Sequence, residues 1–264
     1  MLNDQMQYML KYFINILFLL FISIGVSQED DPSDAQLKDS IEYKQKYGLR
    51  VGIDLSRPLL SFLIDDYTGF EIVGDYRLTE DLYLAVELGN EEKTQNENVE
   101  QSVLYDYTTS GSYIKLGVDK NTYQNWFGMN NQITIGARYA YSSFSQTLNN
   151  FSYFDSNRFF SPDGFVVGSI EPTEFKNLNA SWLEFVLGLK AEVFTNTYIG
   201  ISARLARLVS NNDPENFRNL WIPGFNKVTD ESKWGVGFNY SLSYFLPLYK
   251  KSKKKRKKPV NETE

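Results

Sequence analysis

The sequence predicts an all-β fold: an eight-stranded antiparallel transmembrane β-barrel of the outer-membrane type with longer extracellular loops. Three observations predict it. The 264-residue chain is rich in Tyr (18) and Phe (19), residue types that favour strands. Several segments alternate apolar and polar side chains with the two-residue period of a β-strand. The links between these segments alternate between short and long, as periplasmic turns and extracellular loops do.

The chain begins with a predicted secretory signal peptide, residues 1–27. A lysine precedes an apolar run at 13–25, which is too short to span a bilayer because spanning needs about 20 apolar residues. Gly25 and Ser27 are small residues at the spacing of a cleavage site, and acidic residues follow at once. The alternative is a buried or membrane-anchoring helix. After cleavage, an acidic periplasmic segment at 28–47 would open the mature chain.

The predicted barrel domain covers residues 48–249, where no helical period is sustained. Apolar side chains alternate with polar or small ones in eight segments, an even number as a closed bacterial barrel requires. The predicted strands are residues 49–55, 70–78, 82–89, 114–119, 133–141, 183–193, 199–206 and 234–246.

The links support one orientation of this barrel. Tight or intermediate turns are expected at one end, near residues 79–81, 120–131 and 195–197. The other end has a short link near 65–68 and three long ones, at 90–111, 146–180 and 209–233. With a periplasmic N-terminus, all the long links fall on the extracellular side.

Alternation alone leaves open which face of the sheet lies inside. A soluble, lipocalin-like binding barrel would turn its apolar face inward. Two features favour the membrane barrel instead: glycines on the polar face suit a crowded lumen, and aromatic residues end the apolar face as in an interfacial girdle. The glycines are Gly52, Gly117, Gly136, Gly188, Gly200, Gly235 and Gly237, and the aromatics are Tyr139, Tyr141, Trp234 and Tyr244.

Charged residues on the polar face are predicted to fill the lumen as a salt-bridged network. The interior of an eight-stranded barrel is only just wide enough for side chains, and unpaired buried charges are very costly. The alternative is a proton or ion path. The network residues are Arg50, Asp54, Glu71, Asp75, Arg77, Glu87, Lys115, Asp119, Arg138, Glu184, Lys190, Glu192 and Arg204.

Together with the signal peptide and the membrane polarity, the final strand "FNYSLSYFLPLY" resembles a small bacterial outer-membrane β-barrel of the porin-like superfamily. The pattern is most similar to an uncharacterised family of such barrels. The final strand resembles the sorting signal that these barrels present to their assembly machinery, although 15 residues follow Tyr249. The resemblance covers residues 48–249. It implies a location in the outer membrane of a Gram-negative cell envelope, with both termini periplasmic, and it implies no activity.

The composition excludes most catalytic chemistry. The chain has no Cys and no His, which removes thiolate catalysis, imidazole-based metal sites and His-dependent acid–base mechanisms. Outer-membrane barrel enzymes such as phospholipases and omptin proteases rely on a His. Carboxylates in the long links, such as Asp163, Glu171 and Glu174, show no spacing that singles out a pair. We therefore expect no enzymatic activity, no cofactor and no metal site.

Aromatic links and a basic tail are the candidate partner-binding surfaces. Exposed aromatics are costly unless they cap the barrel mouth or dock another protein. The tail, residues 250–264, is predicted to be periplasmic and to bind anionic lipid, an acidic partner or the acidic N-terminal segment. Solvated disorder is the plain alternative, and nucleic acid is not expected in a secreted protein. The candidate residues are Phe151, Tyr153, Phe154, Phe159, Phe160, Trp221, Phe225, Lys253, Lys254, Lys255 and Arg256.

Two hypotheses of function follow. The first is a non-enzymatic barrel with a plugged lumen, an accessory subunit of an envelope complex such as the outer-membrane protein assembly machinery. Its partners would be outer-membrane lipid and other envelope proteins. The second is a stand-alone barrel that binds or transports a small ligand, which would need a continuous lumen.

Overall fold

We describe the fold from a computed structural model of the chain. It describes residues 44–99, 102–123, 130–157, 159, 162–169, 171–214, 217–228 and 232–252. These residues belong to one compact unit of the chain. The predicted signal peptide, the acidic segment up to residue 43 and the tail from residue 253 onward lie outside the described residues.

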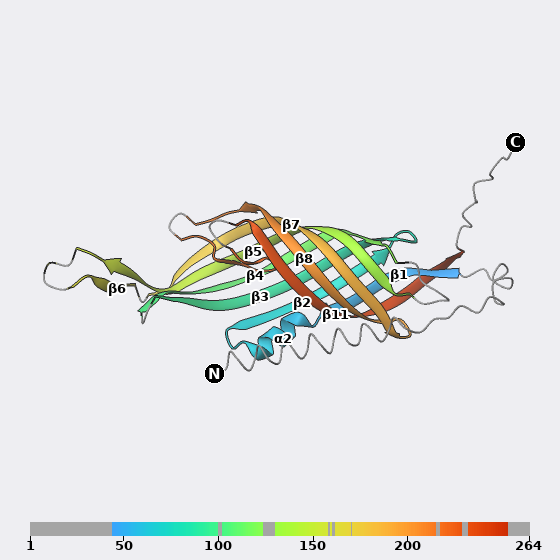
Figure 1. The fold of residues 1–264 in the computed structure, drawn as a ribbon, viewed down its shortest axis with the longest axis horizontal. Coiled ribbons are helices and arrows are strands. Elements are labelled where there is room, and N and C mark those ends of the chain that lie inside the picture. The colour runs from blue at the N-terminus through green and yellow to red at the C-terminus, as the bar shows by residue number, and fades with distance from the viewer. Residues whose placement is uncertain are drawn as a thin grey trace, which may run out of the picture. The chain divides into compact units, whose positions relative to one another are not determined.

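Eight antiparallel strands form a closed ring, so the predicted barrel is confirmed (Figure 1). Each strand pairs with its neighbour along the ring, and β1 closes the ring by pairing with β11 from Lys44↔Ser252 to Asp54↔Ser241. The ring strands are β1 (Lys44–Asp54), β2 (Tyr67–Arg77), β3 (Leu82–Val99), β4 (Ser102–Asn121), β5 (Gln132–Asp155), β7 (Thr173–Phe194), β8 (Thr197–Asn211) and β11 (Trp234–Ser252).

The two ends of the barrel differ in their connections. At one end, β1 begins, β11 ends, and the links at 78–81, 122–131 and 195–196 join neighbouring strands. We call this the tight-turn end. The opposite end, which we call the long-hairpin end, carries extended strand pairs that continue beyond the ring (Figure 1).

Two long links expected from the sequence are largely strand. β3 and β4 pair from Leu82↔Lys120 to Val99↔Ser102, with an irregularity between Glu97 and Asn98, over the described residues of the stretch predicted as an excursion. β5 runs on to Asp155 and pairs there with β6 (Gly164–Ser169), inside the predicted loop at 146–180. In β3 the added residues 91–98 have polar side chains on both faces, so no apolar period marks them, and backbone pairing needs none.

One helix was not predicted. α2 (Ser56–Leu63) follows β1 directly, and its start is fixed by Asp54, whose carboxylate accepts hydrogen bonds from the N–H (2.9 Å) and the hydroxyl (2.7 Å) of Ser56. Eight residues are too few for a helical period to stand out from strand alternation. In the part of the chain described here, no helix has the length and apolar character to cross a membrane.

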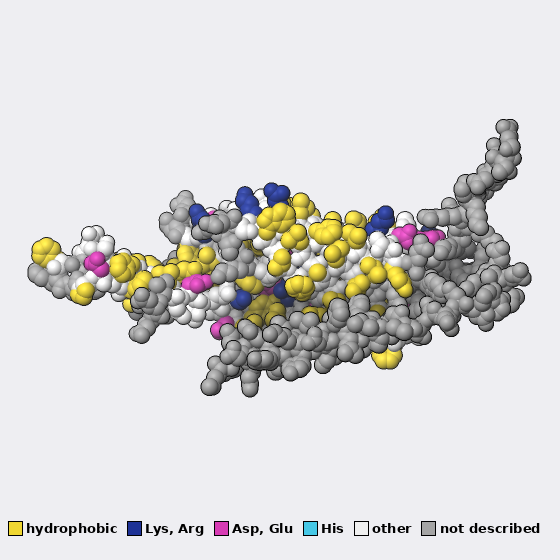
Figure 2. Space-filling view, in the orientation of Figure 1, with side chains coloured by type: hydrophobic (Ala, Val, Ile, Leu, Met, Phe, Trp, Pro, Cys, Tyr) yellow, Lys and Arg dark blue, Asp and Glu magenta, His cyan; other side chains and the backbone are white. Residues whose placement is uncertain are grey.

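The barrel is apolar outside and charged inside. The outward side chains of the strands are between one third and two thirds exposed, and hydrophobic side chains spread over the visible strands in Figure 2. This arrangement overturns the lipocalin-like alternative, which needs the apolar face inside. The outward residues include Leu49, Val51, Leu84, Leu88, Leu116, Val118, Ile133, Ile135, Leu187, Leu189, Ile199, Ile201, Leu205, Leu242 and Leu246.

A hairpin between β8 and β11 folds into the mouth at the long-hairpin end. It consists of β9 (Trp221–Ile222) and β10 (Asn226–Lys227), and Ile222 and Phe225 within it are buried. The Phe225 ring meets the buried Trp182 of β7 edge-on, with ring centroids 5.6 Å apart. An apolar cap therefore closes this end above the charged interior.

Candidate functional site: the charged lumen

The centre of the lumen is organised around Glu87 of β3. Arg204 of β8 donates to both of its carboxylate oxygens, and Arg138 Nε of β5 donates to Oε1 at 3.3 Å. Lys115 Nζ of β4 lies 3.9 Å from Glu87 Oε2. Three cations from three strands thus share one carboxylate.

A second carboxylate, Glu184 of β7, ties the same cations together. Lys115 Nζ lies 3.1 Å from Glu184 Oε1, and Arg204 Nη1 donates to Oε2 at 3.0 Å. The indole N–H of Trp182 also donates to Glu184, at 2.7 Å. The cap and the charge network are therefore bonded to each other.

Arg138 and Asp119 form a bidentate pair beside this centre. Arg138 Nη1 and Nη2 donate to the two Asp119 oxygens at 2.8 and 2.9 Å. Gly136 makes this geometry fit, because a Cβ at that position would collide with the Asp119 carboxylate. The predicted role of this polar-face glycine thus has a specific steric cause.

Toward the long-hairpin end, a group of acids is held by donors of several kinds. Tyr113 donates its hydroxyl to Glu71 and, at 3.3 Å, to Glu91. Arg57 of α2 binds Glu91 at 2.9 Å. Asn239 of β11 donates to Asp54 at 2.7 Å and to Glu71 at 3.0 Å.

Toward the tight-turn end, Arg50 and Lys190 share Asp75. Lys190 Nζ lies 2.6 Å from Asp75 Oδ2, and Arg50 Nη1 lies 3.3 Å from the same oxygen. The Arg50 guanidinium also stands 4.2 Å from the centroid of the Tyr198 ring and donates to Gln132 at 2.9 Å. Aromatic rings and a carboxylate together surround this cation.

Two of the predicted network residues stand apart from it. Arg77 lies at the tight-turn end and donates to the carbonyl oxygens of Lys46 (3.0 Å) and Glu80 (2.7 Å). Glu192 accepts the backbone N–H of Asn196 at 2.8 Å. Both residues help to hold turns at the barrel rim.

Several residues that bind within the lumen were absent from the predicted charge network, among them Arg57, Glu91, Tyr113 and Asn239. Alternate residues of β3 face the lumen, so Glu91 faces inward as Glu87 does, four residues earlier. Continuing the predicted strand past residue 89 would have identified Glu91. Arg57 gave no such signal, because it comes from the unpredicted helix.

The charges inside the barrel are nearly balanced. Seven carboxylates face six cations within 4.0 Å of one another, which offsets much of the cost of removing them from water. The acids are Asp54, Glu71, Asp75, Glu87, Glu91, Asp119 and Glu184, and the bases are Arg50, Arg57, Lys115, Arg138, Lys190 and Arg204.

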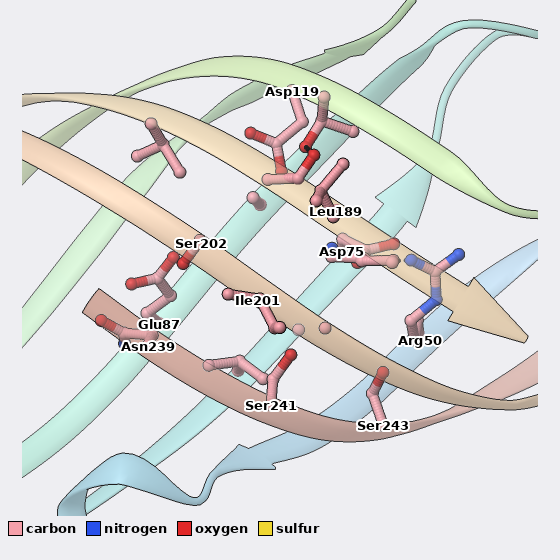
Figure 3. A pocket seen from close by; sticks show the side chains of 18 of the residues that line it. Arg50, Asp75, Glu87, Asp119, Leu189, Ile201, Ser202, Asn239, Ser241 and Ser243 are labelled. Carbon is pink, nitrogen blue, oxygen red and sulfur yellow. Dashed lines mark hydrogen bonds and ion pairs between the residues drawn. The ribbon is translucent and has the colours of Figure 1, made fainter. Parts of the chain in front are cut away.

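Little space remains between these side chains. Arg50, Asp75, Glu87 and Asp119 border a cavity of about 50 Å³ (Figure 3), and a second cavity near the tight-turn end has about 20 Å³. Since a water molecule needs roughly 10–15 Å³ of such space, these cavities have room for only a few waters. Side chains thus fill the lumen around Arg50, Asp75 and Asp119, and a larger space of about 240 Å³ lies between Lys115, Glu184, Arg204 and α2.

The candidate partner-binding residues divide into three groups. Tyr153, Phe154 and Phe159 are exposed near the tip of the β5–β6 extension. Trp221 and Phe225 are buried, as the capping alternative predicts, and Phe151 is half-buried. Phe160 and the tail residues Lys253, Lys254, Lys255 and Arg256 lie outside the described residues.

Comparisons with known proteins identify a family and some distant structural likenesses. A family model described as "Domain of unknown function (DUF6048)" matches residues 9–251. No curated protein sequence matches the chain. The crystal structure of Ail, the attachment invasion locus protein of Yersinia pestis, is similar with 10% identity and a TM-score of 0.35, over 77% of this chain and 99% of that one.

The structures of Acinetobacter baumannii CarO and CarO2 are each 13% identical to the chain, with TM-scores of 0.36 and 0.35. The CarO alignment covers 76% of this chain and 98% of that one, and the CarO2 alignment covers 77% and 100%.

Proposed function

Because the chain belongs to the family described as Domain of unknown function (DUF6048), we propose its function from the physical properties of the barrel. We propose a non-enzymatic outer-membrane β-barrel with an occluded lumen that serves as an accessory subunit of an envelope complex. In this proposal the tight-turn end and both termini face the periplasm, and the long hairpins face outward.

The polarity of the barrel supports the membrane location. Soluble monomers rarely expose apolar patches larger than a few hundred Å², whereas transmembrane barrels carry an apolar band with aromatic residues at its edges. Outward Leu, Ile and Val side chains surround this barrel, and Tyr139, Tyr141, Trp234 and Tyr244 are exposed among them. A closed ring also leaves few backbone groups unpaired in lipid.

The packed lumen is the observation that carries the role. Ion pairs fill the centre, and the apolar cap closes the long-hairpin end. A barrel filled in this way is suited to act through its surfaces. The absence of His and Cys from the sequence supports a non-enzymatic role.

The tip of the β5–β6 extension is the surface that we assign to docking. Phe159 is 91% exposed, and Phe154 and Tyr153 are about half exposed. Phe154 meets Phe165 of β6 edge-on at 5.4 Å, so the aromatic surface is held by the strand pair. Aromatic side chains on a rigid element are typical of interface anchors. The partner proposed is another protein of the envelope.

Purification in gentle detergent tests the proposal. The tagged wild-type protein should bring down another outer-membrane protein in stoichiometric amount, and the variant Tyr153→Ser/Phe154→Ser/Phe159→Ser should lose it. A control variant, Leu78→Ser/Tyr123→Ser, removes exposed apolar side chains at the tight-turn end and should retain the partner. Recovery of the wild type as a lone monomer, or equal recovery from both variants, contradicts the proposal.

A further inference from the structure

The barrel wall has one place where two neighbouring strands are not joined by a strand pair. β1 pairs with β2 only from Leu49↔Tyr76 to Ile53↔Ile72, and its pairing with β11 ends at Asp54↔Ser241. Beyond these points the start of β2 pairs only with β3, and residues 234–240 of β11 pair only with β8. Among the described residues, no strand lies between these two segments.

α2 occupies this gap. The N–H of Leu55, just before the helix, donates to the Tyr240 carbonyl of β11 at 2.6 Å. On the other side, the N–H of Gly69 in β2 donates to the Ser61 hydroxyl of α2 at 2.9 Å. The helix therefore serves as a wall element and satisfies backbone groups that a strand would otherwise bind.

A cavity of about 240 Å³ lies between α2, β11 and the cap hairpin. Its outer lining includes Val236 and Phe238 of β11, each 67% exposed on the outward face. Its inner lining includes Lys115, Glu184 and Arg204 of the charge network. The cavity is thus bordered both by residues of the apolar outer surface and by buried polar groups.

Gly237 keeps this cavity open. It is an inward-facing position, and a Cβ there would meet only the Arg204 Cβ, at 3.9 Å. At Gly235, two residues earlier, a Cβ would lie 3.2 Å from the ring of Phe225. The space inside Gly235 is therefore already filled by that ring. Glycine is unfavourable inside strands, which makes a position with room for a larger side chain an unusual place for it.

Arg204, one of the inner-lining residues, has a buried hydrogen-bond donor without an acceptor among the described residues, and a ligand could reach it once the side chain turns toward the cavity. Arg204 is only 8% exposed, and its Nε has no hydrogen-bond partner although both Nη atoms bind carboxylates. Its positive charge is already balanced by Glu87 and Glu184. The missing partner is therefore an oxygen acceptor, which a neutral head group can supply as well as a charged one.

We propose that this cavity binds a single-chain amphiphile that enters sideways from the bilayer between α2 and β11. The hydrocarbon chain would lie against Leu60, Val236 and Phe238, and the oxygen-bearing head group would accept from Arg204. A volume of about 240 Å³ falls just below the roughly 300–1,000 Å³ of sites for drug-sized ligands, as suits one inserted chain. This goes beyond the proposed accessory role and shares with it only the membrane placement.

Photo-crosslinking of the full chain in detergent tests the proposal. The probes are palmitic acid and monopalmitoylglycerol that carry a diazirine on the acyl chain, with unlabelled ligand as competitor. We expect competable labelling within residues 56–63 and 234–240. The series Gly237→Ala, Gly237→Val and Gly237→Leu should lower it progressively, by about tenfold at Leu, equivalent to about 1.4 kcal/mol.

Gly74→Leu, at an outward-facing glycine of β2, is the control for the added side chain. A Cβ at Gly74 of β2 would also meet only ordinary contacts, at 3.5 and 3.9 Å, but Gly74 does not line this cavity. Ala, Val and Leu are more favourable in a strand than Gly, so the three Gly237 variants should keep the thermal unfolding temperature of the wild type. The mildest variant, Gly237→Ala, adds only one methyl group. Labelling by both probes indicates that the site accepts any head group with an oxygen acceptor. Labelling by palmitic acid alone indicates that the site requires a carboxylate head group.

Labelling spread evenly around the barrel, or unchanged in Gly237→Leu, would overturn the proposal. Because labelling is measured on the isolated protein, it is independent of whether an envelope partner co-purifies.

Discussion

At the scale of single residues, Glu87 makes more ion pairs than any other carboxylate described in the lumen. It contacts Lys115, Arg138 and Arg204, which come from three different strands. A buried carboxylate in this position neutralises several cations at once. Removing its charge leaves guanidinium and ammonium groups unpaired in an environment that solvates them poorly.

Glu87→Gln should therefore be strongly destabilising. We expect the free energy of unfolding to fall by about 3–5 kcal/mol, measured by urea titration of the refolded barrel in lipid vesicles. The control is Glu174→Gln, which breaks the exposed pair between Glu174 and Lys176 at 3.0 Å. That pair is solvated, so its loss should change the free energy of unfolding by about 1 kcal/mol or less. Equal effects of the two substitutions would refute the structural role of the network.

At the scale of elements, α2 is inverted relative to a helix of a soluble protein. Its buried residues are Ser56 and Arg57, whereas Phe62 and Leu63 are 88% and 72% exposed. This polarity matches the strands, which also turn charge inward and apolar side chains outward. The helix thus belongs to the wall in chemistry as well as in position.

A lysine on the outer face of α2 should report whether the helix lies at bilayer depth. We expect Leu63→Lys to lower the free energy of unfolding in vesicles, toward the about 2–4 kcal/mol typical of a lysine at the bilayer midplane. Leu187→Lys, on the outward face of β7, provides the reference for a strand position. An effect of Leu63→Lys no larger than that of Leu78→Lys at the tight-turn end would place α2 outside the hydrocarbon.

At the scale of the whole molecule, two separate layers close the lumen. The hairpin of β9 and β10 caps the long-hairpin end, and the ion pairs fill the centre beneath it. Gly224 of this hairpin donates its N–H to Glu91 at 3.1 Å, which ties the layers together. We expect either layer to occlude the lumen when the other is removed.

We therefore expect no conductance in a planar bilayer, both for the wild type and after residues 221–227 are replaced by a Gly–Ser linker of equal length. The linker variant should unfold at a lower temperature, since the buried side chains of Ile222 and Phe225 are lost. Reproducible channel steps from the wild type would contradict the occluded lumen. Steps from the linker variant alone would show that the cap, rather than the ion pairs, seals the barrel.

The sequence by itself determined the number of ring strands and which side chains share a face. Both follow from a two-residue period, which is local and survives in any short segment such as 82–89 or 183–193. It also brought most of the lumen charges together on one face, including Glu87, Lys115 and Arg204. The stretch 90–111 was expected to be only partly extended, because residues 91–98 carry polar side chains on both faces and show no apolar period.

Only the tertiary structure decided how the wall closes. The gap between β2 and β11 depends on where the pairing of β1 stops, and the contribution of Arg57 depends on an eight-residue helix that fills the gap. The cavity at Gly237 arises from α2, β8 and β11 together, which are distant along the chain. Such features are set by the fit between elements, which no period within one element encodes.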